Sequence, residues 1–478
     1  MLACSVLFLS VIPGIGAQQN SERVIVGAEA RRAADPALVA MLDGEPQLAA
    51  RAALALGRSK KPEARTYLRG LLSNPRTTVR AMAAYALGVL EDPDALTLER
   101  QAALSDSDSS VRYAAIDALG RICTATPDLA TREVADDVIA VLRNDTDPTV
   151  RGHAAVALEV FRSLSETDAT VIAVALVDAF DRDRDHSVRW HVMWTIFRGY
   201  ATRVDRGPLA RALIDSDELV RIEAIRAWAR RADTDAAVLV TPLLNDRSWR
   251  VQLQARETLH ALAKEPAADH LKELPANLHL PPSDRANSEV ALPRPVPAPS
   301  AGAPTTDDLL DPLPLQLRSA AEMNGPMRGN HPRVRIRTTK GDIVLRLYPE
   351  WAPNTVANYL RLVNRGYFDG NRWFRIVPDF VVQTGDPNDN GEGDAGYTIP
   401  AEENPVEQRT GIISMGLNYK DNHAIRDSAG TQFYITISPQ LHLDRDFTVF
   451  GEIESGMNTI ARLIESDRMV RVERLPDR

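Results

Sequence analysis

The sequence contains only two cysteines, Cys4 and Cys123, among 478 residues. Two thiols cannot build a disulfide framework, and they cannot supply the ligands of a thiolate zinc site. Beyond the first residues, no apolar run approaches the ~20 positions that a membrane-spanning helix needs. Basic residues are also outnumbered, 56 against 65 acidic ones. The resulting net charge of −9 argues against non-specific binding of nucleic acid.

The first residues form one apolar run that ends in small side chains. This run predicts a signal peptide over residues 1–17 with cleavage after Ala17, although it lacks the usual positive start. The letters "LAC" at 2–4 also resemble a lipoprotein box, which would anchor Cys4 through lipid. The alternative is a mildly apolar, frayed terminus. We favour export to the periplasm or cell envelope, which leaves Cys123 as the one thiol in an oxidising compartment.

One short unit recurs seven times in the first half of the chain. Its copies begin 31, 32, 39, 38, 32 and 31 residues apart, and a second helical segment, such as 134–144, precedes each copy. This pattern resembles HEAT repeats in their short form, which implies an α-solenoid with a long curved surface over residues 18–272. The copies are "LAARAALALG" (48–57), "VRAMAAYALG" (79–88), "VRYAAIDALG" (111–120), "VRGHAAVALE" (150–159), "VRWHVMWTIF" (188–197), "VRIEAIRAWA" (220–229) and "VQLQARETLH" (251–260).

Two charged positions recur within this unit. An Asp stands three residues before the first Val of four copies, and an Arg follows that Val in five. We predict a structural ladder, in which each Asp caps its own helix and pairs with an Arg of an adjacent copy. The alternative is a stripe that binds a partner. The residues are Asp108, Asp147, Asp185 and Asp217, with Arg80, Arg112, Arg151, Arg189 and Arg221.

The fifth copy departs from the small-residue pattern because it carries two Trp within 190–197. We interpret them as buried packing, and a ligand-facing patch is the alternative. His186 and His191 lie five residues apart, which is not the spacing of two metal ligands on one helix face.

The period is lost over residues 273–331, where segment 281–304 holds seven prolines. Such a segment predicts a semi-rigid, solvated spacer. Residues 332–478 have a different pattern. Apolar and polar residues alternate on both sides of a turn at Lys340-Gly341, which predicts a hairpin, and an amphipathic helix is predicted from Pro353 to just before Gly366. A second helix at 455–467 and a final strand at 469–474 complete the pattern. Many strands with two helices predict a closed β-barrel capped by helices.

The stretch "FRIVPDFVVQTGD" (374–386) raises a question, because an apolar strand should not bury an arginine and a glutamine. Burying either group without partners costs about 1–3 kcal/mol or more. With "TTKGDIVLRLYPEWAPNTVANYLRLVNRGYFDG", "GIISMG" and "AGTQFYITISPQLHLDRDFTVFG", this stretch makes residues 334–474 resemble the cyclophilin-type peptidyl-prolyl isomerases. The resemblance implies that the arginine and the glutamine face a substrate groove.

The resemblance also implies roles for single residues. Arg375 would be the catalytic arginine, Phe380 an aromatic wall, and Gln383 the group that holds the substrate backbone. The substrate-binding set implied alongside them comprises Val381, Gly416, Gln432, Phe433, Tyr434, His442, Leu443 and Phe447. Val381, His442 and Phe447 depart from the usual Met, Trp and His, so we expect altered ligand preference rather than lost activity.

The implied reaction requires no nucleophile, base, metal or cofactor. A donor aimed at the prolyl nitrogen stabilises the twisted amide and not the planar one, and such differential binding accelerates rotation. The segment "DPNDNGEGD" (386–394) faintly resembles a calcium loop, but it lacks the closing Glu, and a glycine-rich loop explains it better.

We therefore expect an isomerase that acts on proline-containing polypeptides, with the repeats binding an unidentified protein partner or targeting the enzyme. The alternative is a scaffold that grips proline segments without turnover. The retained set of Arg375, Phe380 and Gln383 favours the enzyme. A third possibility, an active site within the repeats, has no supporting group of residues.

Overall fold

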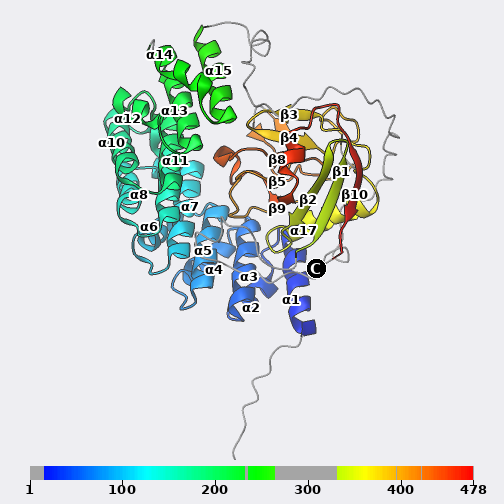
Figure 1. Cartoon of the computed structure of the whole chain (residues 1–478). Helices are drawn as coiled ribbons and strands as arrows, with labels where there is room; N and C mark the ends of the chain where they lie inside the picture. The colour runs from blue at the N-terminus through cyan, green and yellow to red at the C-terminus, as the bar shows by residue number, and fades with distance from the viewer. Residues whose placement is uncertain (1–14, 232–234, 264–330, 394–395, 421–422, 477–478) are drawn as a thin grey trace, which may run out of the picture.

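The computed structural model describes residues 15–231, 235–263, 331–393, 396–420 and 423–476. A curved stack of helix pairs is followed by a curled β-sheet, and the stack runs around one side of that sheet (Figure 1). The predicted spacer falls almost wholly outside the described residues, as does the run 1–14. In the part of the chain that the structure describes, no helix is both long and apolar enough to cross a membrane.

All seven predicted copies are helices, and these form the layer of the solenoid that faces the sheet (Figure 1). Each helix of this inner layer packs against the next, because small Ala and Gly side chains allow close approach; a Cβ on Gly57 would lie 2.7 Å from the Ala86 carbonyl oxygen. The inner helices are α3 (Pro46–Arg58), α5 (Thr77–Leu90), α7 (Ser109–Ala125), α9 (Pro148–Ala157), α11 (His186–Thr195), α13 (Glu218–Arg231) and α15 (Trp249–Ala263).

A second set of helices forms the outer layer of the solenoid. α1 (Ile15–Ala30) precedes the pairs and crosses the boundary predicted after Ala17. The outer helices are α2 (Pro36–Met41), α4 (Ala64–Leu71), α6 (Leu96–Ser105), α8 (Arg132–Asn144), α10 (Glu166–Arg182), α12 (Arg206–Ala212) and α14 (Ala236–Val240).

The charged ladder forms, with one correction to its partners. The four predicted Asp cap their helices; Asp108, for example, accepts from the Ser110 N–H at 2.9 Å. Each Arg of the row pairs instead with an Asp of the next repeat. That Asp stands two residues before the capping position of its repeat, and its carboxylate faces the preceding repeat. The pairs are Arg80–Asp106 (2.8 Å), Arg112–Asp145 (2.6 Å), Arg151–Asp183 (2.6 Å), Arg189–Asp215 (2.9 Å) and Arg221–Asp246 (2.8 Å).

The two Trp of the fifth copy are buried, as expected: Trp190 and Trp194 each expose 8% of their surface. In the described residues, no group of three or more His, Cys, Asp or Glu side chains is arranged to hold a metal ion.

The C-terminal domain is a half-barrel of eight antiparallel strands in the order β10-β1-β2-β9-β5-β8-β4-β3. The closed barrel expected from the sequence is not confirmed, since the edge strands β10 and β3 do not pair. An isolated bridge, Arg372 to Arg468, joins the segments that precede them, and backbone hydrogen bonds such as Trp373 N–H to the Asp467 carbonyl at 3.1 Å accompany it. The strands are β1 (Arg333–Thr338), β2 (Gly341–Leu347), β3 (Arg375–Val377), β4 (Val381–Thr384), β5 (Ile412–Met415), β8 (Phe433–Thr436), β9 (Val449–Ser455) and β10 (Met469–Arg474), with a separate small ladder of β6 (Tyr419–Lys420) and β7 (His423–Ala424).

Two helices accompany the half-barrel, as expected. α17 (Pro353–Asn364) packs its apolar face on the sheet, and the Glu402 carboxylate caps it by accepting from the N–H groups of Asn354 and Thr355 at 3.0 and 2.9 Å. α18 (Met457–Ile460) is shorter than the predicted 455–467 segment.

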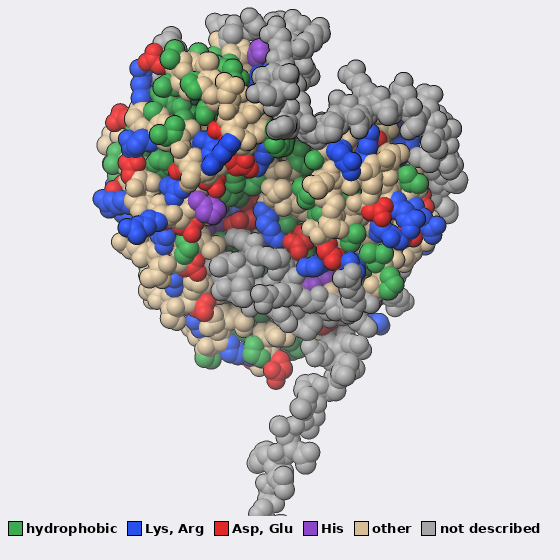
Figure 2. Space-filling model, viewed as in Figure 1, with side chains coloured by type: hydrophobic (Ala, Val, Ile, Leu, Met, Phe, Trp, Pro, Cys, Tyr) green, Lys and Arg blue, Asp and Glu red, His purple; other side chains and the backbone are tan. Residues whose placement is uncertain are grey.

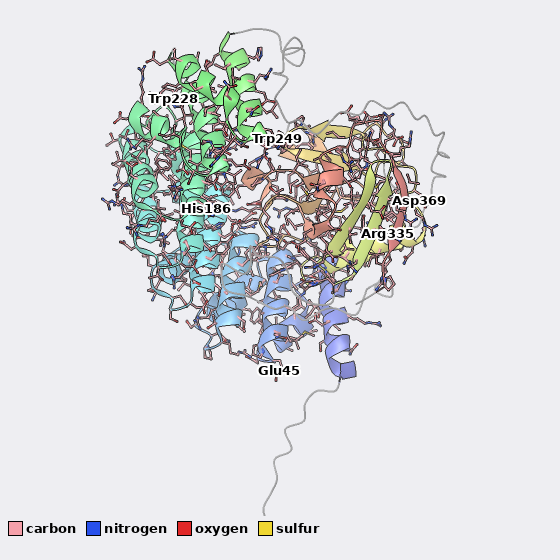
Figure 3. The ribbon with its side chains drawn as sticks, viewed as in Figure 1. Glu45, His186, Trp228, Trp249, Arg335 and Asp369 are labelled. Atoms are coloured by element: carbon pink, nitrogen blue, oxygen red, sulfur yellow. The ribbon has the colours of Figure 1, made fainter. Side chains whose placement is uncertain are left out.

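The solenoid and the half-barrel share a buried apolar core. Tyr348, Trp351, Val406 and Leu441 of the half-barrel belong to the same apolar cluster as the repeat helices. Figure 2 shows side chains of both charges gathered where the two parts meet. Trp249, at the start of α15, lies on the side of the solenoid toward the half-barrel, whereas Arg335 of β1 lies far from it (Figure 3).

Candidate active site

A groove of about 560 Å³ opens on the half-barrel beside strands β3, β4 and β8. It gathers nine of the eleven residues that the sequence nominated. They are Arg375, Phe380, Val381, Gln383, Gly416, Gln432, Tyr434, Leu443 and Phe447. These residues come from separate loops and strands, so only the folded sheet brings them together.

A row of polar side chains forms one wall of the groove. Arg375 and Gln383 are direct neighbours across the β3–β4 ladder, and Arg375 Nη1 donates to Gln383 Oε1 at 3.4 Å. Gln383 Nε2 then donates to Gln432 Oε1 at 3.1 Å, and Gln432 Nε2 donates to the Gly391 carbonyl at 2.9 Å. This chain of bonds holds both glutamine amides in one orientation and leaves most of the guanidinium donors free to face a ligand.

The position of Arg375 resolves the conflict in its strand. Its side chain is exposed rather than buried, because β3 is an edge strand. Its guanidinium carbon lies 5.4 Å from the centre of the Phe380 ring, which is within the range of a cation–π contact. Arg375 therefore lies over the apolar part of the groove while its charge stays in contact with water, so it avoids the desolvation cost of a buried charge.

The opposite part of the groove is apolar. Val381, Tyr434, Leu443 and Phe447 form a small buried cluster of their own, and Phe380 packs against it. The Tyr434 and Phe447 rings meet edge to face at 5.6 Å. Burial raises the pKa of Tyr434 well above its usual value, so the phenol is neutral over the physiological range. A neutral, aromatic surface of this kind fits a proline ring.

Glycine at 416 keeps the polar row in place. A Cβ there would lie 3.2 Å from Gln432 Cβ and 3.3 Å from Gln383 Nε2, so a larger residue would press on both glutamines. The Gly416 N–H also donates to the Gln432 carbonyl at 2.8 Å.

Two nominated residues lie outside the groove. Phe433 is fully buried in the main core of the half-barrel, because side chains alternate along β8 and its neighbours Gln432 and Tyr434 take the groove side. His442 stands behind Phe380, with the two rings stacked at 5.7 Å, and it lines a separate cavity of about 360 Å³ between the solenoid and the half-barrel. That cavity is lined by both acidic and basic side chains, among them Asp117, Arg121, Glu407 and Arg445.

The groove also contains residues that the sequence reasoning missed. These are Phe374, Asn390, Gly391, Leu417, Asn418 and Tyr419. Phe374 directly precedes Arg375, which was a usable signal. Tyr419 lies on a two-residue strand whose sequence gives no such signal; 60% of its surface is exposed. Within the loop that we interpret as glycine-rich rather than calcium-binding, Asp386 accepts from the N–H groups of Asn388 and Asn390, so its carboxylate organises the loop.

Comparisons with known proteins match both parts of the chain. The family model of cyclophilin type peptidyl-prolyl cis-trans isomerase/CLD matches residues 333–475, and that of HEAT repeats matches residues 36–120, 98–196 and 207–279. Peptidyl-prolyl cis-trans isomerase B of Bacillus subtilis is 43% identical over 135 residues, which is 27% of this chain and 90% of the relative. A peptidyl-prolyl cis-trans isomerase of Synechococcus elongatus is 38% identical over 144 residues, 30% of this chain and 95% of the relative.

Among solved structures, a cyclophilin type peptidyl-prolyl cis-trans isomerase of Cryptosporidium parvum is similar to the C-terminal part. It is 25% identical, covers 31% of this chain and 99% of its own, and superposes with a TM-score of 0.29.

Proposed function

The chain belongs to the cyclophilin-type peptidyl-prolyl cis-trans isomerase family, and from this premise we propose that its groove rotates X–Pro bonds in polypeptide clients with Arg375 as the key donor. Arg375, Phe380 and Gln383 are the three residues to which we assign catalysis. The observation that carries the assignment is the position of the Arg375 guanidinium, which donates to Gln383 at 3.4 Å and lies 5.4 Å from the centre of the Phe380 ring, beside the apolar cluster of the groove.

The chemistry follows from the electronic structure of the amide. Conjugation sets a rotation barrier of about 18–20 kcal/mol, and twisting the bond breaks it. The prolyl nitrogen then regains its lone pair and can accept a hydrogen bond, which the planar nitrogen cannot. A guanidinium aimed at this nitrogen therefore stabilises the transition state selectively.

The remaining residues of the groove would hold the substrate during rotation. The cluster of Val381, Tyr434, Leu443 and Phe447 offers the proline ring an apolar surface. Gln383 would fix the adjacent backbone, so that only one side of the peptide turns. Nothing in this mechanism requires proton transfer or a cofactor.

The proposal is tested by measuring cis/trans exchange of a short X–Pro peptide by NMR with the intact chain. Uncatalysed exchange takes about 10–100 s at 25 °C, so catalysis is directly visible as faster exchange. We expect substoichiometric protein to accelerate exchange. Peptide binding without acceleration would contradict the enzyme and favour the non-catalytic scaffold.

We assign partner binding by the repeats to the outer layer of the solenoid. The inner layer is covered by the half-barrel, whose Trp351 and Val406 share its apolar core. The outer helices carry exposed apolar side chains, such as Val174 of α10 and Val238 of α14, which are 61% and 74% exposed. A pull-down with charged substitutions at these two positions tests the assignment, since loss of a captured partner is expected only from outer-layer changes.

We also propose export, on the strength of the apolar run in residues 1–17. Mass spectrometry of the mature N-terminus distinguishes the two routes. Cleavage after Ala17 leaves Gln18 first, whereas a lipid-modified Cys4 would head the lipoprotein form. An unprocessed chain in the cytosolic fraction would contradict both.

A further inference from the structure

Two loops carry three of the apolar side chains of the groove, and the solenoid contacts both loops. The first is the turn between β3 and β4, which carries Phe380. The second is the segment after Leu441, which carries Leu443 and Phe447. Each loop contains one residue, Asp379 or Arg445, that forms an ion pair with an inner helix of the solenoid.

In the first loop, Asp379 lies between two solenoid arginines. Arg250 Nε of α15 donates to Asp379 Oδ1 at 2.7 Å, and Arg226 Nη2 of α13 approaches Asp379 Oδ2 at 3.3 Å. The carboxylate is only 9% exposed and Arg250 13%, so these pairs are shielded from water and exceed ordinary surface ion pairs in strength. Because Asp379 directly precedes Phe380, these pairs also restrict the backbone position of Phe380.

In the second loop, Arg445 reaches the solenoid. Its Nε donates to Asp117 Oδ1 of α7 at 2.9 Å, and Asp117 is 5% exposed. Gly120, one turn further along α7, leaves room for this guanidinium, because a Cβ there would lie 2.9 Å from Arg445 Nη1. Arg445 stands two residues after Leu443 and two before Phe447.

Both anchoring residues have an unfavourable backbone conformation. The φ angles of Asp379 and Arg445 are +53° and +78°, in the left-handed region that most non-glycine residues avoid, although Asp enters it more readily than Arg. Such conformations persist only where the surroundings enforce them. In each loop, an ion pair from the solenoid supplies part of that enforcement.

We propose that the solenoid positions the groove: Arg226 and Arg250 hold Phe380 through Asp379, and Asp117 holds Leu443 and Phe447 through Arg445. We call these three solenoid residues the brace. The repeats are then part of the isomerase and not only a targeting device. This proposal rests on the proposed function for its catalytic readout, but its structural readout is independent of it.

The main test removes both solenoid partners of Asp379 in the full-length chain with the double variant Arg226→Ala/Arg250→Ala. We expect kcat/KM for a proline peptide to fall five- to tenfold. Arg80→Ala is the matched control, because Arg80 forms a similar ion pair with Asp106 inside the solenoid and touches no groove loop. The control should keep the wild-type kcat/KM. An unchanged double variant, or an equal fall in the control, would overturn the proposal.

A rescue variant separates positioning from general stability. Glycine adopts a φ near +53° without strain, so Asp379→Gly added to the double variant should restore part of the lost kcat/KM. With glycine at position 379, the turn keeps its conformation without the brace and holds Phe380 in place. The backbone carbonyl of position 379 still accepts from Gln440 Nε2. A triple variant as slow as the double variant would contradict positioning through this turn.

Hydrogen exchange at the Phe380 amide measures the brace without any catalysis. This N–H donates to the Val377 carbonyl at 3.1 Å and closes the turn. We expect its exchange to quicken severalfold in the double variant and to stay unchanged in Arg80→Ala. If the wild-type chain does not accelerate cis/trans exchange of the peptide, the proposed function fails. Hydrogen exchange at the Phe380 amide then tests by itself whether the brace positions this turn.

Discussion

Arg375 and Gln383 face each other across the first two strands at the edge of the half-barrel, and a 3.4 Å hydrogen bond joins them. The pair couples the proposed donor to the residue proposed to hold the substrate backbone. A donor that is fixed before the substrate arrives needs little reorganisation in the transition state. The pair also explains why an apolar strand sequence carries two polar side chains, since both lie on the groove side.

Arg375→Ala should lower the catalysed exchange rate at least tenfold, which corresponds to about 1.4 kcal/mol or more of lost transition-state stabilisation. The substrate should still bind, because the apolar cluster is unchanged. NMR exchange spectroscopy on an X–Pro peptide measures both quantities. Arg335→Ala is the matched control; this arginine of β1 is paired with Glu473, and β1 contributes no residue to the groove lining. Full activity in Arg375→Ala would exclude it as the donor.

The rate of catalysed exchange should not depend on pH between 6 and 8. The titratable groups in the described groove lining are Arg375 and two tyrosines, and burial raises the pKa of both Tyr419 and Tyr434 above the usual value. An arginine stays protonated throughout this range. A bell-shaped profile of kcat/KM against pH would reveal an acid or base and contradict rotation by electrostatic stabilisation alone.

Two features of the structure could be predicted from the sequence: the helices, from their short-range periodicity, and the groove, from its linked motifs. The seven copies predicted the inner helices, and the motif around Arg375 predicted most of the groove. The burial of Phe433 could have been predicted, because Gln432 and Tyr434 on one face of a strand place the residue between them on the other. The ladder error arose because Asp106 recurs as regularly as Asp108, and only the geometry shows which carboxylate meets the arginine.

Other features had no local signal. The contact between Arg226 and Asp379 joins residues 153 positions apart, and docking of two domains depends on complementary surfaces rather than on periodicity. The same docking explains His442, which stacks behind Phe380 and faces the cavity against the solenoid. Whether the edge strands β10 and β3 pair depends on the tilt and stagger of all the strands between them, and alternation within each strand does not encode this.

Arg58→Ala should destabilise the chain by about 3 kcal/mol, because it removes one partner from a buried set of polar groups. Arg58 is 1% exposed. It pairs with Glu29 at 2.8 Å and donates to the carbonyls of Trp351 and Glu403 at 2.6 and 2.7 Å, so it links the solenoid to the half-barrel. Denaturant unfolding followed by tryptophan fluorescence measures the change.

Arg211→Ala is the control for this experiment. Arg211 pairs with Asp181, but the two side chains are 54% and 41% exposed. Exposed pairs contribute about 0–1 kcal/mol, so the unfolding midpoint should barely move. Equal shifts in the two variants would mean that the link through Arg58 contributes no more than a surface pair.

Glu99→Gln should stabilise the chain at pH 8 more than at pH 5. Glu99 lies on α6 with none of its surface exposed, and neither carboxylate oxygen has a hydrogen-bond partner among the described residues. Burial, followed by repulsion from Asp92 and Asp117, raises the pKa of this carboxyl well above its usual value.

The sign of the pH effect follows from proton binding. Above the unfolded pKa of about 4.3, the folded chain retains the Glu99 proton longer than the unfolded chain, so the free energy of unfolding decreases as pH rises toward the folded pKa. The slope is at most about 1.4 kcal/mol for each pH unit within that window. Glutamine has no proton to lose, so the variant should lack this part of the decline. The exposed Glu45, at the start of α3, provides the control Glu45→Gln (Figure 3). Parallel curves of unfolding free energy against pH for wild type and Glu99→Gln would show that burial does not hold this carboxyl in its neutral form.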